Sequence, residues 1–179
     1  MNRRNFNKIL VASGAGLLLS GTKVFAKTYL SEQQAMQIIW PNIQMHPFST
    51  TLSKEQMKFI KKSSKTRVRS NIVRGFRSSD NSWLIIDNVI GKHEHIDIAV
   101  GLDNKGLVKG VEILTFRESY GDEIINPKWT AQFHGLGNDE VLKLDKHIKN
   151  ISGATLSCRH VTDGVNRLTN TWDYVLRHI

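Results

Sequence analysis

The chain has 179 residues with 40% apolar side chains, enough for one domain with a hydrophobic core and a leader segment. Residues 1–26 hold four of the 25 basic residues and none of the 16 acidic ones, so the rest carries 21 basic residues and a net charge of +5. This mild excess is typical of a solvated surface and would also favour docking on anionic lipid or an acidic partner. No basic block interleaved with aromatics indicates nucleic-acid binding, and the single cysteine excludes an internal disulfide.

The first 26 residues have the pattern of an export signal. A basic head around Arg3 and Arg4 precedes an apolar stretch from Ile9 to Leu19, and small residues near Ala26 suit cleavage by a signal peptidase. The apolar stretch is shorter than the ~20 residues that cross a bilayer, although an uncleaved anchor is the alternative. The arginine pair resembles a twin-arginine signal, with general secretory export as the other route. The sequence therefore predicts a periplasmic or other extracytoplasmic protein.

Residues 27–80 are expected to form a helical cap and a first strand. Two capping boxes, Ser31-Glu32-Gln33-Gln34 and Ser53-Lys54-Glu55-Gln56, predict two short helices. The first ends at Pro41 because proline cannot continue a helix. The segment 42–50 between the helices contains a second proline and is predicted to be irregular.

After the cap, the sequence consists of short runs rich in β-forming residues, in which apolar side chains recur with a period of two. The predicted strands are Arg67–Phe76, Trp83–Ile90, Ile96–Leu102 and Leu107–Phe116. The last two form a hairpin around Asp103-Asn104-Lys105-Gly106, where glycine supplies a positive φ.

The C-terminal part of the chain predicts two more helices. The first starts at Asn126-Pro127 and ends near Gly135, because asparagine caps and proline suits the first helical position. A final strand leads to Ile151, and an amphipathic helix runs on to Val175. The predicted fold class is α+β, a twisted antiparallel sheet with helices packed against it.

The stretch ISGATLSCRHVTDGV, residues 151–165, lies between that strand and the last helix. Ser152, Thr155 and Ser157 offer more hydroxyls than one helix cap needs, and Gly153 and Ala154 leave the backbone accessible. The free N–H groups and positive dipole end of a helix start attract an anion such as phosphate. A capped helix start after a turn is the interpretation that needs no ligand.

The run Ser152-Gly153-Ala154-Thr155-Leu156-Ser157 resembles the S/T-G-A-T motif of the FMN-binding domain family. That family includes one component of the sodium-pumping NADH:quinone oxidoreductase and one component of the Rnf complex. The resemblance implies that FMN is esterified to Thr155 through its phosphate by a Mg-dependent FMN transferase with FAD as donor. It also implies a set of residues around the cofactor: Ser152, Gly153, Ala154, Leu156, Ser157, Glu118, Ser119, Tyr120, Gly121 and Trp129.

The resemblance extends over roughly Trp83 to Leu168, and residues 81–179 are expected to form the FMN-binding domain. The loop 118–124 stands in place of an E-T-P-G-type loop, and its Tyr120 is expected to stack on the isoalloxazine ring. One departure is Lys149, which occupies a position where the family often has an acidic residue; Asp145 is the nearest acid upstream.

The resemblance implies a carrier of electrons between membrane-bound redox partners, with the redox chemistry supplied by the flavin. Two alternatives stay open: a flavin-dependent reductase with its own substrate, and a flavin-free binding or sensory module. A hydrolase is disfavoured because no G-x-S-x-G elbow is present. His93 and His95 lack a third ligand at metal-binding spacing, and Cys158 is expected to be a packed side chain.

Overall fold

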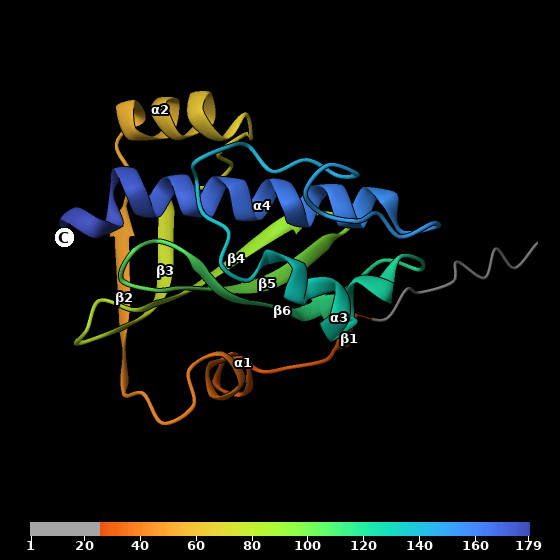
Figure 1. Cartoon of the computed structure of the whole chain (residues 1–179), viewed down its shortest axis with the longest axis horizontal. Helices are drawn as coiled ribbons and strands as arrows, with labels where there is room; N and C mark the ends of the chain where they lie inside the picture. Colours follow the sequence, from red (N-terminus) through yellow and green to blue (C-terminus); the bar gives the residue numbers. More distant parts are fainter. Residues whose placement is uncertain (1–25) are drawn as a thin grey trace, which may run out of the picture.

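The computed structural model describes residues 26–179 and confirms the α+β fold (Figure 1). Six strands form one antiparallel sheet in the order β1-β6-β5-β4-β3-β2. The strands are β1 (Lys27–Thr28), β2 (Met45–Thr51), β3 (Ile72–Ser78), β4 (Trp83–Ile90), β5 (His95–Leu102) and β6 (Val108–Phe116). The predicted export signal falls, except for Ala26, outside the described residues. Within them, no helix is long and apolar enough to span a bilayer.

The helices lie on both faces of the sheet (Figure 1). They are α1 (Glu32–Ile39), α2 (Lys54–Ser64), α3 (Pro127–Thr130) and α4 (Thr155–Tyr174), with 3-10 turns η1 (Asp122–Ile125), η2 (Ala131–Phe133) and η3 (Leu176–His178). Both predicted capping boxes are present: the side chains of Ser31 and Ser53 accept from Gln34 and Gln56 backbone N–H groups, and both glutamines reciprocate.

The two faces bury cores of different size. The face under α4 and α2 carries the larger apolar cluster, which includes Trp83 and Ile85 from β4 and Val161 and Val165 from α4. The face under α1 carries a smaller cluster, to which Leu84 and Ile86 of β4 contribute together with Ala35, Ile39, Trp40, Ala99 and Leu114. Because successive side chains of a strand point to opposite faces, the continuous apolar run of β4 serves both cores.

An ion pair fixes α4 on the sheet. Nη2 of Arg167 lies 2.5 Å from Oδ2 of Asp87 on β4, and the same guanidinium donates to the backbone carbonyl of Asn88 at 3.2 Å. The Arg167 side chain is only 8% exposed, so the pair is shielded from water. This contact fixes how α4 sits across the sheet, and so where its N-terminus lies.

Three sequence predictions about elements need correction. The segment predicted to be irregular contains β2, whose Pro47 is tolerated because β2 is an edge strand that pairs only with β3. The predicted first strand starts at Ile72 rather than Arg67. The predicted final strand before Ile151 is wrong, since that segment holds only an isolated bridge between Leu144 and Ile148.

Two further boundaries are refined. The helix predicted from Asn126 begins as expected, with the Asn126 side chain accepting from the Lys128 N–H at 3.0 Å, but it continues as the 3-10 turn η2. The sheet also gains the two-residue strand β1, which pairs with the end of β6 and was not predicted.

Candidate functional site

The start of α4 is not capped by a side chain. Ala154 is the N-cap residue, and its N–H donates a 3.0 Å hydrogen bond to the carbonyl of Ile151, which closes the turn before the helix. The interpretation in which one of the three nearby hydroxyls caps this helix is therefore wrong. Without a capping side chain, the first-turn N–H groups of α4 are available to an anion.

Thr155 is the first residue of α4, and its hydroxyl is held by one neighbour. Nδ2 of Asn150 donates a 3.0 Å hydrogen bond to Oγ1 of Thr155. Oδ1 of the same asparagine is buried without a hydrogen-bond partner. Because an amide N–H can only donate, the threonine oxygen accepts, and its own proton is left free for another group.

Thr155 lies at the edge of a cavity of about 310 Å³ with charged and apolar lining residues. The cavity lies between the start of α4, the end of α2 and the segment 141–145. Its charged lining residues are Lys65, Lys143, Asp145, Arg159 and Asp163. Burial raises the pKa of Asp163, although His160, Arg159 and Arg167 act in the opposite direction. Three cationic side chains face two acidic ones, so the cavity is suited to an anionic group.

On the other side of the helix start, the loop after β6 packs closely. A Cβ added to Gly121 would lie 2.7 Å from Oγ of Ser157 and 3.6 Å from Cα of Ala154. The φ angle of Gly121 is +94°, which also favours glycine. The structure thus brings the predicted loop and the predicted motif into contact, and only glycine fits between them.

Glu118 anchors this loop to the turn between β4 and β5. Its carboxylate accepts hydrogen bonds from the backbone N–H groups of His93 and Glu94, the latter at 2.8 Å. Burial works against ionisation of Glu118, but these backbone bonds outweigh it and lower the pKa of the carboxyl. The next two residues are free of this anchor: Ser119 and Tyr120 are exposed, and Tyr120 has 85% of its surface accessible.

Trp129 positions the segment before the motif from within the core. The side chain is 5% exposed, and its Nε1 donates a 2.8 Å hydrogen bond to the carbonyl of Lys149. The N–H of Lys149 in turn donates to Oε1 of Gln132 at 2.8 Å. The ring packs edge-on against Phe133. The structure therefore places Trp129 behind the peptide that leads to Asn150 and Thr155.

The remaining candidates from the sequence do not form a second site. Among residues 26–179 no group of three or more histidine, cysteine or acidic side chains could hold a metal ion, and Nδ1 of His95 is 3.0 Å from Oδ1 of Asn88. Cys158 is completely buried beneath the motif, and this burial raises the pKa of its thiol.

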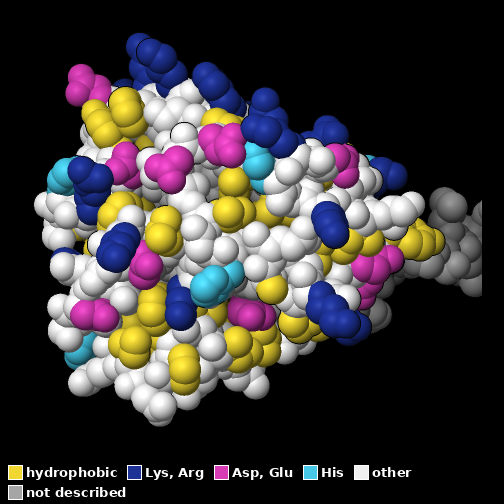
Figure 2. Space-filling view, in the orientation of Figure 1, with side chains coloured by type: hydrophobic (Ala, Val, Ile, Leu, Met, Phe, Trp, Pro, Cys, Tyr) yellow, Lys and Arg dark blue, Asp and Glu magenta, His cyan; other side chains and the backbone are white. Residues whose placement is uncertain are grey.

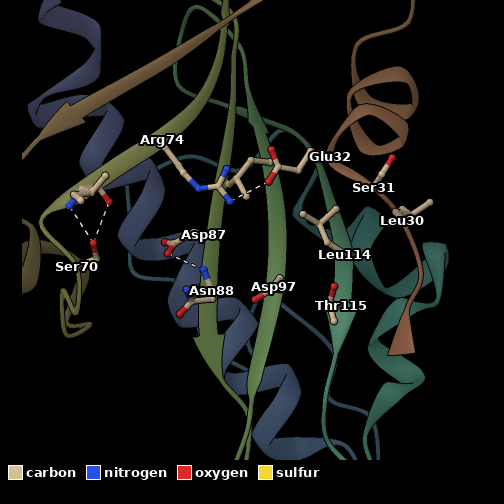
Figure 3. Close-up of a pocket in the computed structure, with 12 residues that line it drawn as sticks. Leu30, Ser31, Glu32, Ser70, Arg74, Asp87, Asn88, Asp97, Leu114 and Thr115 are labelled. Carbon is tan, nitrogen blue, oxygen red and sulfur yellow. Dashed lines mark hydrogen bonds and ion pairs between the residues drawn. The ribbon is translucent and has the colours of Figure 1, made fainter. Parts of the chain in front are cut away.

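A larger cleft of about 470 Å³ lies on the α1 side of the sheet (Figure 3). Arg74 and Glu32 point toward each other across it and form an ion pair at 2.9 Å. None of the residues predicted to surround a cofactor lines this cleft. Size alone therefore does not identify the candidate site, which is the smaller cavity beside Thr155.

Residues 91–170 match the family model of the FMN-binding domain. The resemblance to the FMN-binding domain family is confirmed. The matched segment runs from the β4–β5 turn to the last turn of α4, so it includes Glu118, Gly121, Trp129 and the whole motif. The crystal structure of NqrC from Shewanella oneidensis is similar, with 18% identity, a TM-score of 0.49, and coverage of 80% of this chain and 84% of that one. No curated protein matches the chain.

Sequence reasoning missed three residues of the matched segment that surround Thr155. Arg159 carried a usable signal, because a residue four positions after Thr155 lies on the same face of a helix. Lys143 and Asn150 carried no such signal, since both belong to a segment without regular structure whose path depends on contacts with α3, η2 and α4.

Proposed function

We propose that this protein is an exported flavoprotein with FMN linked through its phosphate to Oγ1 of Thr155, and that it passes electrons between membrane-bound redox partners. The family match supports FMN as the cofactor. The covalent linkage is proposed from one observation: the hydroxyl of Thr155 stands at an uncapped helix start, oriented by Asn150, beside a cavity with three cationic side chains.

The residues around Thr155 fit a phosphodiester of FMN. The linkage would carry one negative charge, which the N-terminus of α4 and the side chains of Lys65, Lys143 and Arg159 would offset. Gly153 has a φ of +88°, and a Cβ built there would have no heavy atom within 4 Å. The backbone just before Thr155 is therefore open to the transferase and to a large planar ligand.

Each residue has a separate part in this scheme. Asn150 fixes the direction of the Thr155 oxygen and leaves the hydroxyl proton free for a base on the transferase. Tyr120, which is almost fully exposed beside Gly121, offers an aromatic face for stacking. Trp129 holds the peptide before Asn150 in place. When bound, FMN supplies one- and two-electron redox chemistry, and the partners supply and remove the electrons.

The test is in-gel flavin fluorescence of the full chain, expressed with and without an FMN transferase and run under denaturing conditions. The wild-type band should fluoresce only with the transferase, and Thr155→Val should be dark. The matched control is Thr162→Val, because Thr162 is a second threonine of α4 that lines the same cavity and donates to the carbonyl of Cys158.

Fluorescence of Thr155→Val equal to the wild type would contradict the linkage. A dark wild-type band beside a transferase that labels another target would also contradict it. A noncovalent flavin would then be detected as yellow colour in the native protein that is lost on denaturation.

A further inference from the structure

One face of α2 is lined with lysines. Lys54, Lys58, Lys61 and Lys62 recur with the spacing i, i+4, i+7 and i+8, so they share one stripe of the helix. Lys65 follows as the left-handed C-cap residue. The stripe continues into the next segment, and we define the basic face as Lys54, Lys58, Lys61, Lys62, Lys65, Arg67 and Arg69, all of which are exposed.

The charge of the described chain is concentrated on this face. Residues 54–69 contain these seven basic residues and one acid, Glu55, which gives a net charge of +6. Residues 27–179 together have a net charge of +5, so everything outside this short segment sums to −1. Figure 2 shows Lys and Arg side chains gathered along the edge of the molecule where α2 lies in Figure 1.

The basic face is not neutralised by the protein itself. Within residues 26–179, none of its seven side chains forms an ion pair. α2 packs inward through Ile60 and Ser64, both of which are fully buried. Phe59 stacks on Tyr174 of α4 at a centroid distance of 3.8 Å, which fixes the helix against α4 while its lysines face outward.

The composition of the basic face indicates the kind of partner. Specific protein interfaces are depleted in lysine and are built around aromatic and arginine anchors in pockets. Lysine ammonium groups on flexible stems instead match a diffuse layer of negative charge, such as anionic lipid headgroups. We propose that the basic face of α2 docks this protein on an anionic bilayer surface.

Docking through this face would place the candidate site near the bilayer. Lys65 belongs to the basic face and also lines the cavity beside Thr155. A protein held by α2 would therefore present that cavity close to the headgroups, where membrane-bound partners would reach it. The proposal does not require FMN attachment, since every observation that carries it concerns α2 and the residues that follow it.

The test is co-sedimentation of the full chain with vesicles of phosphatidylcholine alone or mixed in equal parts with phosphatidylglycerol. The protein should bind the anionic vesicles more tightly than the neutral ones, and rising salt should weaken this preference. Each lysine contributes about fivefold to the binding constant, so the triple variant Lys58→Gln, Lys61→Gln, Lys62→Gln should bind on the order of 100-fold more weakly.

The control is a second triple variant with the same change in net charge, Lys105→Gln, Lys109→Gln, Lys128→Gln, from exposed positions outside the basic face. It should bind within a few fold of the wild type. The wild type and both triple variants share the same N-terminal segment, so any insertion of that segment into the bilayer contributes equally to all three binding constants.

Equal binding to both vesicle types, or equal losses in both triple variants, would overturn the proposal. So would retention on an immobilised acidic polypeptide without binding to anionic vesicles, because that result would assign the face to an acidic protein.

Discussion

The two sides of the α4 start differ in how they are filled. On one side, Gly121 lies so close to Ser157 and Ala154 that no side chain fits between the loop and the helix. On the other, Thr155 borders a cavity of about 310 Å³. The closed side fixes the position of the helix start, and the open side leaves one hydroxyl and one anion-binding surface available. Small residues of the same region therefore serve opposite purposes, close packing and access.

The largest expected effect on the free energy of unfolding comes from one of a matched pair of glycine substitutions. Gly121→Ala combines a φ of +94° with a Cβ 2.7 Å from Oγ of Ser157, and should cost about 2–4 kcal/mol of unfolding free energy. Gly153→Ala carries similar backbone strain at a φ of +88° but meets nothing within 4 Å, and should cost about 1 kcal/mol. Urea unfolding of both variants measures the difference, and equal losses would show that the closed side is not tightly packed.

A smaller loss of stability is expected at Glu118, which anchors the loop on the closed side. Glu118→Gln replaces a carboxylate that accepts two backbone N–H groups, and should lower stability at pH 7 by about 1 kcal/mol. The pKa of Glu118 is lowered from its ordinary 4.5, so its stabilising contribution is present above that pH and is lost as pH falls through the folded-state pKa.

The difference between wild type and Glu118→Gln should therefore shrink as acid is added, which a series of urea titrations from neutral to acidic pH would follow. Glu123→Gln is the control, because Glu123 is exposed in the same loop. A loss that stays constant over the whole pH range would show that the charge of Glu118 does not stabilise the loop.

The prediction for the open side concerns the rate of flavin attachment, and the expected change in stability is small. Asn150→Ala removes the hydrogen bond to Oγ1 of Thr155 and should slow flavin attachment roughly tenfold, because the hydroxyl loses its orientation. The same variant removes an amide oxygen that is buried without a partner, which offsets part of the cost in stability. Initial rates of flavin incorporation, beside thermal unfolding of the same samples, separate the two effects. A wild-type rate would show that Asn150 has no positioning role.

The central elements of the fold were predictable because local and tertiary signals agree there. β4 has the predicted bounds Trp83–Ile90, since its apolar run is buried on both faces. Both capping boxes form as predicted. Elements that depend on distant partners were missed: β2, with its polar sequence and Pro47, is a strand because β3 pairs with it.

The candidate site was predictable in part for the same reason. The stretch 151–165 was predicted to lead into the last helix, and the family resemblance placed the loop and the motif around one cofactor. The start of α4 at Thr155 and the close contact at Gly121 come from the structure. The cavity was not predictable, because the end of α2, which supplies part of its lining, is far in the chain from the segment 141–145 and the start of α4, which supply the rest. Trp129 was placed among the cofactor contacts, yet it lies in the core and donates to the carbonyl of Lys149.

The burial of Cys158 gives the molecule a built-in reporter. It is the single thiol of the chain, it is wholly inaccessible, and it lies one turn after the residue that begins α4. A thiol reagent can reach it only when the start of this helix separates from the sheet. The rate of labelling of the native protein therefore counts those openings, and it would show directly how firmly Thr155 and its surroundings are held.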